Sequence, residues 1–200
     1  MIRALTLALS LGIASATAAL AEETGQAIFA GGCFWCVESD FDKVPGVLST
    51  TSGYIGGEND NPTYENHTRY RHREAVLIEY DPAQVDYEQL LHSFFRSVDP
   101  LDAGGQFCDR GFSYTTAVYA IDDTQLQQAQ AAKAAAEAEL GQSVVTEVVA
   151  APTFWPAEEY HQDFYRKNPL RYSYYRNACG RDRRVEEVWG EAAMAGIGGS

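Results

Sequence analysis

The sequence predicts a single α+β domain, and three observations support this. A chain of 200 residues fits one ordinary domain. Short β-branched and aromatic runs alternate with amphipathic segments that end at glycine or proline. No period of 20–50 residues occurs, which excludes repeat architectures. With 46% hydrophobic and 22% charged residues, the composition also excludes a wholly disordered chain.

The elements of the first half follow from local patterns. Residues 26–30 form an apolar run that ends at a pair of glycines, which predicts a strand followed by a tight turn. Residues 33–43 place their apolar side chains on one helical face and stop before Pro45, which predicts a helix. Residues 47–55 are β-branched and aromatic, and they predict the second strand.

A long polar loop separates the second strand from the third. This loop, residues 58–72, is of the length typical of functional loops. Residues 74–80 predict a strand, and residues 86–96 predict an amphipathic helix with Asp86 as its N-cap. Residues 115–121 predict the fourth strand.

The resulting order, β-α-β-β-α-β, matches the ferredoxin-like arrangement. An extra helix over residues 125–140 and an extra strand over 144–150 follow this core, and residues 156–167 predict one more short helix. We expect an irregular C-terminal segment after them, and a flexible tail over residues 190–200, which are rich in glycine and alanine.

The first 21 residues have the pattern of a secretory signal peptide. A single charge, Arg3, precedes an Ala- and Leu-rich run, and the segment closes with the small-x-small sequence Ala19-Leu20-Ala21. A membrane anchor and a buried N-terminal helix are the alternatives. We expect an exported chain, periplasmic or secreted, whose folded domain covers residues 22–189.

The net charge limits the partners. The 15 basic and 28 acidic residues give a formal net charge of −13. Such a field repels phosphate backbones and anionic lipid, so we expect no nucleic-acid binding and no stable membrane association. We expect a monomer.

The densest chemical signal is the C-x-x-C motif of Cys33 and Cys36 at the start of the first helix. A cysteine at a helix N-terminus gains thiolate character, so we expect a low pKa for Cys33. Zinc is disfavoured as an alternative because Cys108 and Cys179 are single and far apart, and no metal is expected. A buried structural cysteine or a permanent disulfide remains open. Phe34 and Trp35, inside the motif, could line a recognition pocket or pack in the core.

Six motifs occur in a fixed order along residues 28–169: GCFWCVE, NPTY, HREAV, Asp109-x-Gly111-x-x-Tyr114, FWPAEEYHQDF and KNP. In this combination the chain resembles the A-type peptide methionine sulfoxide reductases. The resemblance implies reduction of methionine S-sulfoxide, in proteins or free, without a bound cofactor. It implies that the electrons come from a thioredoxin-like protein or another dithiol.

The resemblance also implies a role for each matching residue. Cys33 would attack the sulfoxide sulfur and become a sulfenic acid, and Glu74 would donate the proton. Tyr64, Tyr114 and Asp109 would hold the sulfoxide oxygen, and Phe34 and Trp35 would form the pocket for the methyl group. The four histidines receive no catalytic role.

A second thiol must clear the sulfenic acid, and three cysteines are candidates. Many relatives carry glycine where Cys36 stands, and many place a resolving cysteine soon after KNP, where this chain has Tyr172-Ser173. We expect Cys36 to resolve first, with Cys108 and Cys179 as a second pair that serves either as a relay or as a structural disulfide.

Two other functions compete with this interpretation. An extracytoplasmic thiol–disulfide oxidoreductase would use the Cys33/Cys36 pair but leaves Tyr64, Glu74 and Asp109 without roles. A secreted binding module with two structural disulfides would show no titratable thiol.

Overall fold

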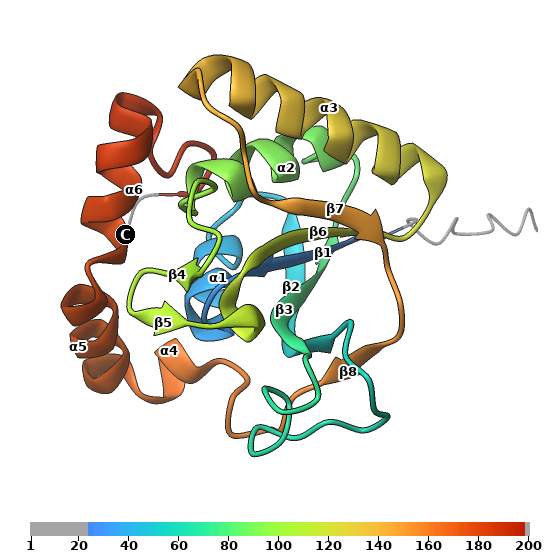
Figure 1. Ribbon diagram of the computed structural model, residues 1–200, viewed down its shortest axis with the longest axis vertical. Helices are drawn as coiled ribbons and strands as arrows, with labels where there is room; N and C mark the ends of the chain where they lie inside the picture. Colours follow the sequence, from blue (N-terminus) through green and yellow to red (C-terminus); the bar gives the residue numbers. More distant parts are fainter. Residues whose placement is uncertain (1–23, 199–200) are drawn as a thin grey trace, which may run out of the picture.

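The computed structural model describes residues 24–198, and the predicted signal peptide lies outside them. A six-stranded sheet has the order β7-β6-β1-β3-β2-β8 (Figure 1). Its strands are β1 (Gly25–Gly31), β2 (Val47–Ile55), β3 (Arg73–Tyr80), β6 (Thr116–Ala120), β7 (Glu147–Ala150) and β8 (Phe154–Pro156). A separate hairpin joins β4 (Gly105–Gln106) to β5 (Asp109–Arg110). The helices are α1 (Phe34–Phe41), α2 (Tyr87–Arg96), α3 (Asp123–Leu140), α4 (Phe164–Lys167), α5 (Pro169–Cys179) and α6 (Arg181–Trp189).

The four central strands confirm the ferredoxin-like core. Their order, β6-β1-β3-β2, is antiparallel at every step. The extra helix, α3, returns the chain so that β7 pairs parallel with β6. At the other edge β8 pairs antiparallel with β2. The predicted cap of α2 is also confirmed, because the Asp86 carboxylate accepts from the Gln89 amide at 2.8 Å and the Gln89 side chain accepts from the Asp86 amide at 2.9 Å.

Alternation along the strands gives the sheet two apolar faces. Ala27 and Phe29 belong to the main core, which also contains buried side chains of α1, α2 and α3. Ile28 and Ala30 point to the opposite face and pack in a smaller cluster with Ile55. The C-terminal end of β1 is therefore held from both sides, and it fixes where α1 begins.

The segment after β7 differs from the predicted helix over residues 156–167. Pro156 ends β8, and only α4 is helical there. The Gln162 side chain accepts from the Ser52 amide and donates to the Ser52 carbonyl, both at 2.9 Å, as a neighbouring strand would. Asp163 then takes a left-handed conformation with φ of 53°. These tertiary contacts replace the helical hydrogen bonds that the sequence pattern favoured.

The C-terminal segment is not irregular, because it forms α5 and α6. Figure 1 shows these two helices along one side of the domain, and the Cys108–Cys179 disulfide joins α5 to the β4–β5 hairpin. Arg181 is 1% exposed and donates to the carbonyls of Gly31 at 3.1 Å and Ser97 at 2.9 Å. Val185 and Trp189 of α6 are also buried in the main core, but the buried Arg181 interrupts an apolar-face pattern at the start of this helix.

Residues 190–198, expected to form a flexible tail, are held against the domain. The Met194 amide donates to the Arg96 carbonyl at 2.9 Å, and the Gly198 amide donates to the Lys43 carbonyl at 3.2 Å. Among the described residues, no helix is both long and apolar enough to cross a bilayer.

Candidate active site

A small cavity of about 60 Å³ opens at the N-terminus of α1. Every residue predicted for nucleophilic, acid, orienting or substrate-binding roles lines it, together with one that the motifs did not indicate. The lining residues are Cys33, Phe34, Trp35, Tyr64, Glu74, Asp109, Tyr114 and Tyr175. Residues from five separate parts of the chain thus converge at one point.

The turn between β1 and α1 places Cys33 at this cavity. Gly32 has a φ of +87°, and a Cβ there would come within 2.6 Å of the Gln106 side chain, so the turn requires glycine. Cys33 is the N-cap of α1, and its carbonyl accepts from the amides of Cys36 at 3.1 Å and Val37 at 3.3 Å. The Cys33 side chain is buried but lines the cavity.

Glu74 reaches the same point from β3. It is 2% exposed, and burial raises the pKa of its carboxyl to about 8. Its Oε2 accepts from the Phe34 amide at 2.9 Å, so the first amide of α1 has a carboxyl oxygen as its hydrogen-bond partner. A carboxyl that keeps its proton at neutral pH can act as a general acid.

The charge of the cysteine pair differs from the expectation of a low pKa for Cys33. Burial raises the pKa of the Cys33 thiol well above its usual range, and the hydrogen bond with Cys36 adds to this effect. The same hydrogen bond lowers the pKa of the Cys36 thiol, and the positive charges of Arg181 and Arg176 lower it further, against the effect of burial. The pair therefore carries its negative charge first on Cys36, because the hydrogen bond from Cys33 and the two cations both favour it there.

Asp109 and Tyr175 form one wall of the cavity. The Tyr175 hydroxyl, on α5, donates to the Asp109 carboxylate and is also within hydrogen-bond reach of Cys33. Burial raises the pKa of Asp109. The sequence contained a usable signal for Tyr175, since Tyr172, Tyr175 and Cys179 are spaced i, i+3 and i+7 and would share one helical face.

Two more phenols face the acid. Tyr64 lies in the loop between β2 and β3, where its amide donates to the Glu158 carboxylate at 2.9 Å. Tyr114 ends the 3₁₀ turn Phe112–Tyr114. Burial and the neighbouring Glu74 raise the pKa of both phenols. Both side chains therefore stay protonated and can donate hydrogen bonds.

Phe34 and Trp35 form a fixed aromatic wall. Phe34 is 1% exposed and serves both the main core and the cavity. The Trp35 ring stacks on Phe164 with ring centroids 3.7 Å apart, and its Nε1 donates to His161 Nδ1 at 3.1 Å. The structure thus shows that both side chains line the cavity and that Phe34 also packs in the main core, while recognition of a substrate by this wall stays a prediction.

Two histidines without an assigned role also lie beside the site. His161 accepts from Trp35, as described. His67 is 2% exposed, and its Nε2 lies 3.6 Å from Glu74 Oε1. His67 lies three residues after Tyr64, in a loop whose fold the sequence does not specify, and no local pattern marked it.

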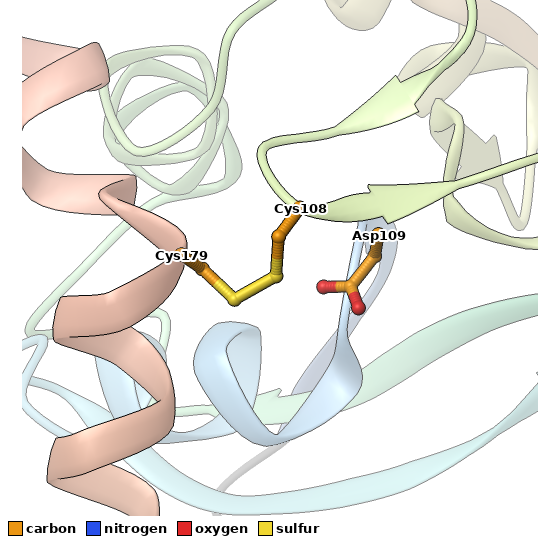
Figure 2. A group of neighbouring side chains, drawn as sticks. All are labelled: Cys108, Asp109 and Cys179. Carbon is orange, nitrogen blue, oxygen red and sulfur yellow. A yellow bond between two sulfur atoms is a disulfide. The ribbon is translucent and has the colours of Figure 1, made fainter.

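The three candidate resolving cysteines separate into two kinds. Cys36 is free and buried beside Cys33. Cys108, in the β4–β5 turn, is bonded to Cys179 at the end of α5, and the two lie 71 residues apart in the sequence. Figure 2 shows this disulfide with the Asp109 carboxylate next to it. Cys108 is exposed and Cys179 half-buried. Because their sulfurs are bonded to each other, they offer no thiolate to a metal.

The comparisons with known proteins agree with this geometry. The family profile described as "Peptide methionine sulfoxide reductase" matches residues 25–193. The chain is 59% identical over 179 residues to "Peptide methionine sulfoxide reductase MsrA 2" of Rhizobium meliloti, covering 90% of each chain.

Two solved structures are also similar. "Methionine sulfoxide reductase A of Corynebacterium diphtheriae" has a TM-score of 0.70 at 31% identity and covers 74% of this chain and 76% of its own. Reduced Mxr1 of Saccharomyces cerevisiae has a TM-score of 0.70 at 28% identity, covering 73% and 86%. The motifs, the fold, the converging site and these likenesses together show that the chain belongs to the peptide methionine sulfoxide reductase family.

Proposed function

We propose that this chain is a peptide-methionine (S)-S-oxide reductase that returns oxidised methionine, in proteins and free, to methionine. One observation carries the proposal: Cys33 and the protonated carboxyl of Glu74 open onto the same small cavity, between hydroxyl donors and an aromatic wall.

The oxygen-transfer step uses both groups. The Cys36 thiolate accepts the Cys33 proton through their hydrogen bond, which leaves a thiolate on Cys33. Cys33 Sγ attacks the sulfoxide sulfur while Glu74 gives its proton to the sulfoxide oxygen. The attack forms a bond between Cys33 Sγ and the substrate sulfur. The OH then moves from that sulfur to Sγ while the S–O and S–S bonds break, so methionine leaves and Cys33 becomes a sulfenic acid. Cys33 is oxidised by two electrons, and Glu74 is left as a carboxylate.

The selectivity for one epimer follows from two fixed sites. Tyr64 and Tyr114 donate to the oxygen, and Asp109 orients that side of the cavity through Tyr175. Phe34 and Trp35 accept the methyl group. When the oxygen and the methyl group both have fixed positions, only one of the two sulfoxide epimers can turn its sulfur atom toward Cys33.

Cys36 resolves the sulfenic acid. Its thiol attacks Cys33 Sγ, the hydroxyl leaves as water, and a Cys33–Cys36 disulfide forms. Cys36 is suited to this because it is free, already touches Cys33, and lies in the same turn of α1. The Cys108–Cys179 disulfide then serves as a structural link that holds α5 beside Asp109.

A dithiol protein of the thioredoxin class would reduce the Cys33–Cys36 disulfide. Mxr1 of yeast has been solved in complex with Trx2; that structure, at 21% identity, shares only the fold with this chain. For this chain the proposal rests on its own cysteines. No bound cofactor is needed, because the electrons enter by thiol–disulfide exchange.

Export is part of the proposal. The signal-like pattern of residues 1–21 supports it, and a disulfide such as Cys108–Cys179 persists in an oxidising compartment. Cell fractionation and N-terminal sequencing of the expressed full chain test it. We expect a periplasmic or secreted product that begins at Glu22, and a cytosolic product that begins at Met1 would contradict it.

The activity is tested with the purified protein, excess dithiothreitol and the separate S and R epimers of a protected methionine sulfoxide. We expect chromatography to show consumption of S alone. If neither epimer is consumed, the reductase proposal fails, and reduction of insulin disulfides would then test the thiol–disulfide oxidoreductase alternative.

A further inference from the structure

The carboxyl group of Glu74 has a different neighbour at each oxygen. Oε2 accepts from the Phe34 amide at 2.9 Å, so this oxygen takes the carbonyl part when the group is protonated. Oε1 lies 3.6 Å from His67 Nε2, and both side chains are 2% exposed. The acidic hydrogen therefore belongs on Oε1, the oxygen that faces the histidine.

The hydrogen bonds of His67 fix which of its nitrogens is bare. Nδ1 lies 2.8 Å from the backbone carbonyl of Tyr64, and a carbonyl can only accept, so Nδ1 carries the hydrogen. Burial lowers the pKa of His67, which keeps the ring neutral. Nε2 therefore carries no hydrogen and presents one lone pair. The Thr68 hydroxyl lies 3.2 Å from it, and this hydroxyl must turn away when the Glu74 carboxyl donates to Nε2.

The ring cannot turn away easily. It is stacked between two tyrosines, with centroid distances of 5.0 Å to Tyr54 and 5.6 Å to Tyr64. A small rotation of the Glu74 carboxyl brings Oε1 into hydrogen-bond range of Nε2.

We propose that His67 is a positioning residue for the acid of the reaction: its bare Nε2 accepts from the Glu74 carboxyl, holds the hydrogen on Oε1 and keeps the group protonated until substrate arrives. The inference rests on the proposed function, since it assigns a purpose to the protonated Glu74. A hydrogen bond to the neutral acid, together with a lone pair facing the carboxyl, disfavours the carboxylate.

Other titratable groups face the pair and stay unchanged when only His67 is replaced. Around Glu74 these are Cys33, Cys36, Asp109 and the phenols of Tyr54, Tyr64 and Tyr114. Around His67 they are His72, Glu158 and His161. A change in the pH profile on replacing His67 is therefore assigned to the lost contact with Glu74.

Two substitutions distinguish the role of Nε2 as a hydrogen-bond acceptor from the role of the ring in stacking. His67→Phe keeps an aromatic ring between the tyrosines but has no acceptor. His67→Gln loses the ring, yet its amide oxygen reaches the place of Nε2. The readout is kcat/KM for the S epimer from pH 6 to 9, because this ratio ends at oxygen transfer and does not depend on recycling of the enzyme.

We expect His67→Phe to lose about tenfold in kcat/KM near pH 8 and less at pH 6, with the alkaline fall shifted to lower pH. We expect His67→Gln to stay within about threefold of the unchanged protein at every pH. His72→Gln is the matched control: His72 is a buried histidine of the same loop that bonds Asn59 instead of Glu74, and its alkaline fall should not move.

The opposite ranking, with Phe active and Gln inactive, would assign His67 to stacking alone and overturn the proposal. Equal activity in both variants, or equal loss without a shift of the profile, would overturn it as well. Melting curves identify a variant that fails to fold. If this is His67→Phe, His67→Met replaces it, because Met has the length of Gln without its amide, and the expectation is the same. If it is His67→Gln, the alkaline fall of His67→Phe compared with that of His72→Gln decides. An inactive unchanged protein would instead contradict the proposed function.

Discussion

The two cysteine pairs of this chain meet by opposite routes. Cys33 and Cys36 are three residues apart, buried and unbonded at the N-terminus of α1, with cations near Cys36. Cys108 and Cys179 are 71 residues apart, bonded to each other and partly exposed. The first pair is close because of local helical spacing, and the second because α5 packs beside the β4–β5 hairpin. The two cysteines that are close within one helix keep free sulfurs that can react. The two that are brought together by the fold form a disulfide that links distant segments.

The largest expected effect separates the members of the first pair. Cys33→Ser should give no methionine at all, because no other group at the cavity can attack the sulfoxide sulfur. Cys36→Ser should still give one equivalent of methionine per enzyme in a rapid-quench experiment, but more slowly, because a serine hydroxyl cannot take the Cys33 proton as the Cys36 thiolate does. It should lose turnover with a dithiol protein. Full turnover by Cys36→Ser would show that another thiol resolves the sulfenic acid.

The next effect concerns the acid that serves the first pair. Glu74→Gln keeps an oxygen for the Phe34 amide but cannot release a proton, so kcat/KM should fall about 10²- to 10⁴-fold. In the unchanged protein the protonated form is the active one, and burial raises its pKa to about 8. The rate should therefore decline above pH 8. It should also fall at low pH, because the cysteine pair must lose a proton before Cys33 can attack. A pH profile that is flat through pH 8 to 9 would remove Glu74 from this role.

The second pair should affect stability more than chemistry. Replacing Cys108 and Cys179 together by alanine opens a long loop and should lower the free energy of unfolding by about 2–4 kcal/mol. Denaturant melts measure this change. Because the link plays no part in resolution, the methionine burst should remain and turnover should drop by only a few-fold. Loss of turnover with an intact burst and an intact fold would instead favour the relay interpretation.

The smallest expected effect concerns the hydrogen bond between Tyr175 and Asp109, which connects the disulfide-bonded helix α5 to the cavity. Tyr175→Phe removes the hydroxyl that binds Asp109, one helical turn before Cys179. Loss of a neutral hydrogen-bond donor to a partly buried carboxylate should weaken substrate binding by about 1–2 kcal/mol. KM should therefore rise roughly tenfold, and the epimer preference should be kept. Tyr174→Phe is the control, because Tyr174 is 79% exposed on the same helix, and it should leave KM unchanged.

Much of the fold was predictable because its burial is apolar and periodic. Local sequence patterns indicate which residues are buried in these elements. Examples are the β-branched runs of β1, β2 and β3 and the amphipathic face of α2. The C-terminal helices were harder to predict, because polar groups help to fix them beside the few apolar side chains that they bury, such as Val185 and Trp189. Arg176 donates to Asp40 at 2.7 Å, and Arg181 donates to two backbone carbonyls. Such residues resemble a solvated surface in any sequence pattern.

The sequence by itself determined the ferredoxin-like core, the reactive cysteine at a helix start and the set of motif residues, because each depends on neighbours in the chain. Only the tertiary structure decided that Cys108 pairs with Cys179, that Tyr175 completes the cavity and that His67 faces Glu74. It also lowered the pKa of Cys36, because the Cys33 thiol donates to it and because Arg181 and Arg176 approach from helices about 140 residues later in the chain. These are long-range contacts, and electrostatic and hydrogen-bond energies depend on distances that only the folded chain defines.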